Sequence, residues 1–185
     1  MRGLSLVALL LAGFTSAARA QSQQRWSVQG SGALVFPTAE ESDFENSTRL
    51  GWEAQVRYTF SRFSLGAGYQ NATVYKFTAN DVDFSAGLSI FFLEPRYVLL
   101  AGSTAAAYAA GRIGGSKLSC NIEGCAEQGM HFAIGAGGGV LVRLGSRVSL
   151  DLGSQYFTTQ YDLAVPGETA STGYILARLG LSVGL

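Results

Sequence analysis

The sequence predicts an all-β protein, an eight-stranded antiparallel up-and-down transmembrane β-barrel. Eight stretches alternate apolar and polar residues with a period of two, which is typical of two-faced strands. After the first 20 residues, no segment approaches the ~18 consecutive apolar residues that indicate a spanning helix. The 48% of apolar residues and the 24 glycines are instead interleaved with polar residues. This arrangement suits strands with one face toward lipid and one toward a lumen.

The first 20 residues have the layout of a secretory signal peptide. Met1 and Arg2 precede an apolar run over 4–14, and Ala18-Arg19-Ala20 fits an A-x-A cleavage site. The run is shorter than the ~20 residues of a spanning helix, which disfavours an N-terminal membrane anchor. We expect 1–20 to be removed and 21–185 to form one barrel domain.

The stretch 50–60 shows the alternation most clearly. One face carries Leu50, Trp52, Ala54, Val56, Tyr58 and Phe60, and the other carries Gly51, Glu53, Gln55, Arg57 and Thr59. Its length matches the ~9–11 residues with which a tilted strand crosses a bilayer. Aromatic rings lie toward its ends, where they favour the headgroup region.

Seven further stretches repeat the pattern. They cover 25–36, 63–75, 82–98, 105–114, 130–142, 148–159 and 173–185. In the stretches at 63–75, 130–142, 148–159 and 173–185, we expect the apolar set to face outward. Alanine and glycine dominate 105–114, so its two faces stay unassigned.

The stretch 82–98 contains a conflict of parity. We expect the apolar residues from Val82 to Ile90 to face outward, but Glu94 and Arg96 have the same parity. A charge facing lipid at mid-depth costs about 2–4 kcal/mol. We therefore predict a β-bulge near 90–93 that shifts the alternation by one residue.

The predicted connections at one end are on the whole longer than those at the other. They cover 37–47, 76–81, 115–128 and 160–172 at one end, and 61–62, 99–104 and 143–146 at the opposite end. Outer-membrane barrels have long loops outside the cell and short periplasmic turns. The acidic run at 40–45 indicates either a solvated loop or a site for divalent cations or host surfaces.

Together these features resemble the small eight-stranded outer-membrane barrels, the family of the OmpA transmembrane domain and OmpX-like proteins. The resemblance also rests on Phe92-Leu93-Glu94-Pro95-Arg96-Tyr97 before a turn and on a final strand that ends at Leu185, where family members usually have Phe or Trp. It implies a location in the cell outer membrane, contact with lipid and lipopolysaccharide, and insertion by the barrel-assembly machinery. We expect no peptidoglycan-binding domain.

Charged residues on the inward faces predict a network in the lumen. The candidates are three acids and three bases: Glu53, Arg57, Glu94, Arg96, Asp151 and Arg178. An eight-stranded barrel is barely wide enough for side chains to fill, so these charges must pair or trap water. A network that plugs the lumen is our interpretation, and a gated ion path is the alternative.

The single histidine, His131, raises the possibility of an enzyme. Members of the family that this sequence resembles use a histidine with a nearby Ser or Asp when they act on lipid A. No His-x-Ser occurs here, because position 133 is alanine. We therefore expect no enzymatic activity, with a lipid A deacylase or acyltransferase as an alternative.

Cys120 and Cys125 are the only cysteines, and four residues separate them. In an exported protein this spacing favours a small disulfide loop over two free thiols or a metal site. We expect no metal and no cofactor. Lys and Arg (13) balance Asp and Glu (13) without a basic patch, so no nucleic-acid partner is expected.

These expectations describe a monomeric, non-enzymatic outer-membrane barrel. Its role would be structural support of the membrane or surface interaction through its loops. A narrow pore and a lipid A-modifying enzyme are the alternatives. A soluble lipocalin-like barrel is disfavoured, because charges on the inward faces are the inverse of an apolar-ligand carrier.

Overall fold

The computed structural model describes residues 25–38, 49–79, 82–120, 129–162 and 169–185. The strands are β1 (Trp26–Pro37), β2 (Arg49–Phe60), β3 (Phe63–Ala79), β4 (Val82–Ala101), β5 (Ala105–Cys120), β6 (His131–Arg143), β7 (Val148–Asp162) and β8 (Thr169–Gly184). No helix in the described ranges is long and apolar enough to cross a membrane. The expected signal peptide and the acidic run lie outside these ranges.

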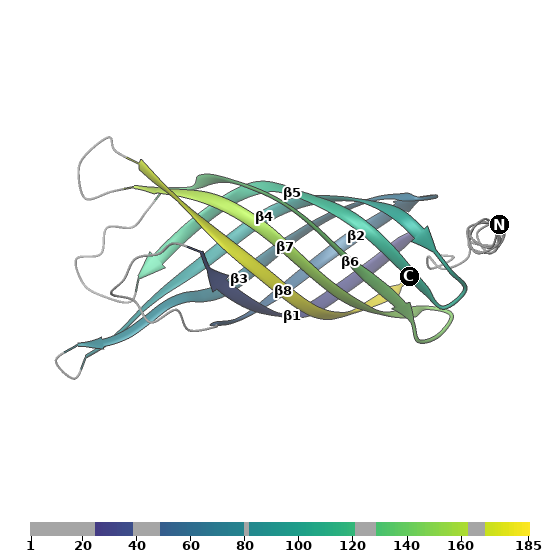
Figure 1. Ribbon diagram of the computed structural model, residues 1–185, viewed down its shortest axis with the longest axis horizontal. Coiled ribbons are helices and arrows are strands. Elements are labelled where there is room, and N and C mark those ends of the chain that lie inside the picture. Colours follow the sequence, from purple (N-terminus) through teal and green to yellow (C-terminus); the bar gives the residue numbers. More distant parts are fainter. Residues whose placement is uncertain (1–24, 39–48, 80–81, 121–128, 163–168) are drawn as a thin grey trace, which may run out of the picture.

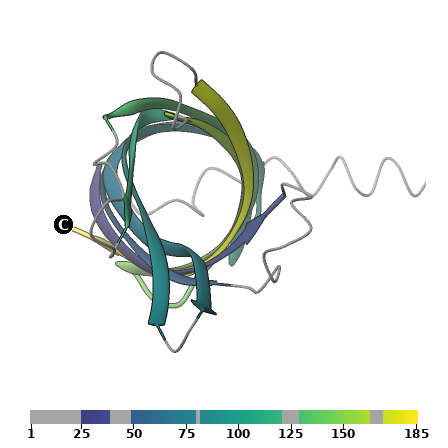
Figure 2. The same cartoon turned by 90° about the vertical axis from the view of Figure 1, so that its left-hand side faces the viewer.

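The eight strands form one closed antiparallel barrel, as the alternation predicted (Figure 1). Each strand pairs with its neighbours in sequence, and β8 returns to β1 from Ser27↔Gly184 to Pro37↔Tyr174. The view along the barrel shows a continuous ring (Figure 2). Closure leaves no unpaired sheet edge, which a bilayer could not hydrate.

Three short connections lie at one end of the barrel, together with the start of β1 and the end of β8 (Figure 1). They are Ser61 with Arg62, 102–104 and 144–147. Ser61 has a φ of 56°, the left-handed conformation that closes the tight turn predicted between β2 and β3. We call this the short-turn end and the opposite one the long-loop end.

Several strands reach further toward the long-loop end than the alternation predicted. β3 continues to Ala79, β5 to Cys120 and β7 to Asp162, and β8 already begins at Thr169. The predicted loops 76–81, 115–128 and 160–172 are correspondingly shorter. Backbone pairing needs no apolar face, so a ladder can continue where the side-chain pattern gives no signal.

The outer surface is apolar and the predicted faces of β3, β6, β7 and β8 are confirmed. Exposed apolar side chains occur on all eight strands, among them Val28, Val56, Leu65, Leu93, Ile113, Ile134, Leu152 and Leu179. Aromatic rings form two groups, Trp26, Tyr58, Phe60 and Phe63 at the short-turn end and Trp52, Tyr69 and Phe91 nearer the long-loop end. Two aromatic levels around an apolar band are typical of a membrane barrel.

The predicted bulge at 90–93 is wrong. β4 pairs with β3 without interruption from Gln70↔Ile90 to Gly66↔Glu94. Leu88 and Ile90 are buried in the lumen on the same face as Glu94 and Arg96. The register shifts lie elsewhere, between Thr73 and Tyr75 and between Val98 and Leu100. The error came from assigning apolar residues to the lipid face, although the lumen has an apolar section of its own.

The lumen is filled in layers along the barrel axis. The larger apolar cluster lies on the long-loop side and comprises Ala33, Val35, Ala72, Val74, Leu88, Ile90, Phe92, Ala133, Phe157, Tyr174 and Leu176. A smaller cluster on the short-turn side comprises Val98, Ala106, Tyr108 and Ala110. Between and beside them lie the buried polar and charged side chains.

Candidate functional site

All six ionisable residues predicted for the lumen are buried inside the barrel, and Arg112 joins them. They come from β2, β4, β5, β7 and β8. In each case the inward parity of the strand decides the direction of the side chain, since a closed barrel offers every second residue only the lumen. The site is therefore a ring of strands whose charged side chains converge on the axis.

Glu94 on β4 is the centre of this network and has an exposed fraction of 0%. Its Oε1 accepts hydrogen bonds from Arg57 Nη2 at 2.8 Å and Arg96 Nε at 2.7 Å. Its Oε2 accepts from Arg112 Nη2 at 2.7 Å and from Arg178 Nη1 at 2.9 Å. Gln155 Nε2 donates to the same oxygen at 2.8 Å. One carboxylate thus joins five strands.

Glu53 on β2 is held by the two arginines that also hold Glu94. Arg112 Nη2 lies 2.6 Å from Glu53 Oε2, and Arg178 Nη1 lies 3.2 Å from Oε1. Gln55 Nε2 donates to Oε1 at 3.3 Å. Arg112 and Arg178 therefore bridge two buried carboxylates, the arrangement that a low-dielectric interior requires.

Asp151 on β7 forms the third acidic point, on the short-turn side of Glu94. Arg96 Nη1 lies 2.8 Å from Asp151 Oδ2, and Gln29 Nε2 donates to the same oxygen at 2.8 Å. Tyr108 donates its hydroxyl proton to Oδ1 at 2.6 Å and accepts from Arg178 Nη2 at 3.0 Å. The carboxylate is thus bound by groups from three strands other than its own.

Glu53 and Arg57 lie on the same strand, but they do not form an ion pair with each other. Arg57 pairs with Glu94 and also donates to Ser64 Oγ at 3.1 Å. Gln55 links the two, since it donates to Glu53 and accepts from Arg57 Nη2 at 2.7 Å. The network therefore runs around the barrel more than along one strand.

Arg112 is the functional residue that sequence reasoning missed. It bonds Glu53, Glu94 and Gln70, the last through Nη1 to Oε1 at 2.6 Å. Its guanidinium carbon also lies 3.8 Å from the ring centroid of Phe92, a cation–π contact. The sequence left the faces of the Ala- and Gly-rich β5 unassigned, and the burial of Arg112 together with Tyr108 now shows which face is inward.

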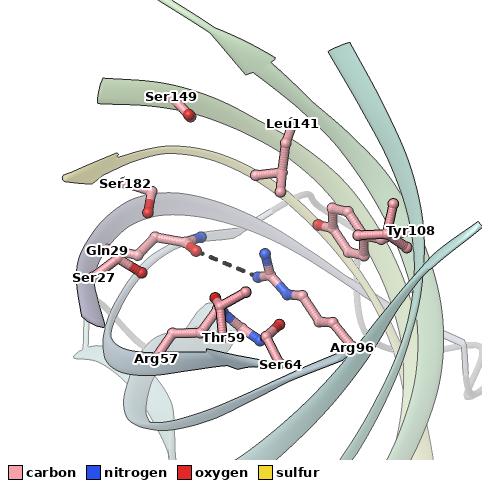
Figure 3. A pocket seen from close by; sticks show the side chains of 11 residues that line it. Ser27, Gln29, Arg57, Thr59, Ser64, Arg96, Tyr108, Leu141, Ser149 and Ser182 are labelled. Atoms are coloured by element: carbon pink, nitrogen blue, oxygen red, sulfur yellow. Dashed lines mark hydrogen bonds between the residues drawn. The ribbon is translucent and has the colours of Figure 1, made fainter. Parts of the chain in front are cut away.

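A cavity remains in the lumen on the short-turn side of the network (Figure 3). The volume that the centres of water molecules can occupy in this cavity is about 40 Å³. This is several times the roughly 10–15 Å³ that one water molecule needs. Arg57, Arg96 and Tyr108 line one part of it, and Ser27, Ser149 and Ser182 line another. The figure shows the Arg96 guanidinium reaching toward Gln29, to which Nη2 donates at 3.4 Å.

His131 lies at the first position of β6 and is half-buried. Its backbone oxygen accepts a hydrogen bond from Ser116 Oγ at 3.3 Å, and the Ser116 hydroxyl also contacts Thr159 Oγ1. The buried carboxylates Glu53, Glu94 and Asp151 all engage the arginines described above.

The predicted disulfide falls at the edge of the structure. Cys120 ends β5, whereas Cys125 lies outside the described residues, so the pairing stays a prediction. Within the described ranges, no group of three or more His, Cys, Asp and Glu side chains could hold a metal ion.

Comparison with solved structures identifies the fold. Neisserial surface protein A superposes with a TM-score of 0.70 over 86% of this chain and 97% of that protein, at 14% identity. The fold is that of a small outer-membrane β-barrel. No protein-family model and no curated protein matches the sequence.

Two further barrels match at similar coverage. Ail, the attachment invasion locus protein of Yersinia pestis, has a TM-score of 0.58 at 11% identity and covers 86% of this chain and 97% of its own. The N-terminal barrel domain of OprF from Pseudomonas aeruginosa has a TM-score of 0.51 at 12% identity, with coverages of 86% and 97%. At such low identity the likeness concerns the fold.

Proposed function

We propose that the protein is a non-enzymatic outer-membrane β-barrel with a closed lumen, anchored with its long connections outside the cell. The observation that carries this proposal is the inverted polarity of the barrel. Apolar side chains are exposed on the outside, whereas seven ionisable side chains are buried within. A protein with such an outer surface dissolves poorly in water, and its exposed apolar side chains fit the hydrocarbon core of a bilayer.

The experiment is fractionation of expressing cells followed by gel electrophoresis of boiled and unboiled samples. A folded membrane barrel resists detergent, so we expect the protein in the outer-membrane fraction with a faster unboiled band. A periplasmic protein with identical mobility in both samples would contradict the proposal. It would point instead to a soluble barrel.

A role at the cell surface is the specific function that we infer. At the long-loop end the sequence passes from β1 to β2 through 39–48, from β5 to β6 through 121–128 and from β7 to β8 through 163–168. Connections between strands carry function on a rigid scaffold. One similar structure is that of Ail, the attachment invasion locus protein, in complex with a heparin analogue, which favours attachment as the type of activity to test.

The test of the surface role keeps the barrel and changes its connections. Residues 121–128 are replaced by a Gly-Ser segment of equal length, and adhesion of expressing cells to host cells and to immobilised heparin is compared with the unchanged chain. We expect reduced adhesion with unchanged heat-modifiable mobility. Equal adhesion, repeated for 39–48 and 163–168, would restrict the protein to structural support.

A narrow pore is the second candidate, because charged and polar side chains line the lumen. The closed layers oppose it: Ile90, Glu94, Asp151 and Leu176 all have exposed fractions of 0%. In planar bilayers we expect no discrete conductance steps from the purified chain. Reproducible steps that change with Glu94→Gln would favour the pore.

A further inference from the structure

The buried ionisable side chains of the described lumen do not balance. Four guanidinium groups, those of Arg57, Arg96, Arg112 and Arg178, accompany the carboxylates of Glu53, Glu94 and Asp151. One positive charge is therefore uncompensated among these fully buried groups. An uncompensated charge in a low-dielectric interior is costly, so it favours the uptake of a counter-ion.

The lumen cavity on the short-turn side is the place where such an ion fits. Arg57 and Arg96 belong to its lining, and no carboxylate side chain does. The neighbouring acids are already engaged: Glu94 has four arginine partners, and Asp151 binds Arg96, Tyr108 and Gln29. The cavity thus lies at the positive edge of the network.

Hydroxyl groups supply further donors around the same space. Ser27, Thr59, Ser149 and Ser182 line the cavity, and none of their hydroxyls has a hydrogen-bond partner within the described residues. Arg57 Nε, in a side chain that is 93% buried, also has no partner there. Hydroxyls rotate freely and can donate to an anion from several sides.

These four hydroxyls come from neighbouring strands around the ring. Ser149 on β7 pairs in register with Ser182 on β8, and Ser182 pairs with Gln29 on β1. Figure 3 places Ser27, Ser149 and Ser182 along the wall that faces Arg96 across the cavity. Arg96 on one side, the hydroxyls of Ser27, Ser149 and Ser182 on the other, and Thr59 beside Arg57 form an anion cradle.

We propose that this cavity binds one small monovalent inorganic anion of the size of chloride. The volume of about 40 Å³ admits such an ion with water and excludes a bulky organic anion. The ion balances the surplus guanidinium charge and gives the unpartnered hydroxyls an acceptor. The site is independent of the surface role proposed above.

The first test is the heat stability of the purified full chain, refolded in detergent, in sodium chloride and in sodium gluconate at equal ionic strength. We expect a saturable rise of the unfolding midpoint with chloride and none with gluconate, which is too large to enter. Equal midpoints at all concentrations of the two salts would overturn the proposal.

Substitutions in the cavity wall test whether the chloride-dependent stabilisation comes from this cavity. Ser149→Ala combined with Ser182→Ala removes two donors without touching the ion pairs, so the chloride concentration for half-maximal stabilisation should rise at least about tenfold, because a hydrogen bond to a charged group is a strong one. Ser154→Ala, on the exposed outer face of β7, is the matched control and should behave as the unchanged chain. Unaltered chloride dependence in the double variant would place the ion elsewhere and refute the site.

Anomalous scattering from a crystal of the full chain grown in sodium bromide gives a direct measurement. We expect a bromide peak between Arg96 and the Ser149–Ser182 pair. Density explained by water alone, without an anomalous signal, would mean that the cavity is only hydrated.

Discussion

Glu94 is the residue on which the charge network of the lumen depends most. Its two oxygens accept from four arginines and one glutamine, and its neighbours hold the other two acids. Removing one partner of a buried ion pair costs far more than the pair contributes, because it leaves charges without compensation. The largest effects should therefore follow from this carboxylate.

We predict that Glu94→Gln lowers the free energy of unfolding by about 3–5 kcal/mol, because it leaves the surrounding arginines facing a neutral amide. Denaturant unfolding of the chain refolded in lipid vesicles measures this. Arg62→Gln in the exposed turn between β2 and β3 is the control and should change the value by less than about 0.5 kcal/mol. Equal stability of the two variants would show that the network contributes nothing.

The pairing around Glu53 gives a second prediction at this scale. In double-mutant cycles built from Glu53→Gln, we expect a coupling energy of about 1–3 kcal/mol with Arg112→Met, since the two side chains are in direct contact. With Arg57→Met we expect a smaller coupling energy, since the two side chains share Gln55 as a partner but make no ion pair with each other. The same unfolding measurement serves both cycles. The opposite order of the two energies would contradict the described pairing.

At the scale of the element, the inward glycines of β3 make room for the network. A Cβ on Gly68 would lie 2.6 Å from the Ala54 carbonyl oxygen and 2.7 Å from both Gln55 Cβ and Phe92 Cζ. The backbone of Ala54 cannot move away from an added Cβ, whereas the end of a flexible side chain could. Glycine at this position is thus a packing requirement of the lumen.

We predict that Gly68→Ala destabilises the barrel by about 1–3 kcal/mol through overpacking. Gly32→Ala on β1 adds the same methyl group where nothing lies within 4 Å, so it is the matched control and should be nearly neutral. Urea titration of both refolded variants tests the difference. Identical midpoints would mean that the lumen is looser than its geometry indicates.

At the scale of the whole molecule, the barrel is a closed cylinder with an apolar outside and a polar and charged section inside. The two aromatic groups on its outer surface mark two levels along the axis. If the outer face lies in lipid, the free-energy cost of placing a charged side chain on it depends on how deep in the bilayer that side chain lies.

We predict that Leu179→Arg, at an outward position of β8 that is 55% exposed, costs about 2–4 kcal/mol in vesicles. Leu50→Arg, at the long-loop end of β2 and 76% exposed, should cost about 0–1 kcal/mol. Unfolding in vesicles compares the two. If both were tolerated equally, the outer face would not lie in a bilayer.

The sequence by itself determined the strand number, the antiparallel order and six of the seven charged residues that are buried in the described part of the lumen. Strand alternation is a local property, so 50–60 reveals its two faces without knowledge of any other strand. The same holds for Asp151, which lies between Leu150 and Leu152, and for Arg178, the only charged residue of β8.

Only the tertiary structure decided which charges meet and where the lumen is apolar. Arg112 pairs with Glu53 across the barrel, 59 residues away, and nothing in the Ala- and Gly-rich β5 indicates that partner. Leu88 and Ile90 face inward because a cluster from five other strands covers them, so β4 needs no bulge before Glu94. The environment of an inward side chain is set by the opposite wall of the barrel, and closure of the ring brings that wall into contact.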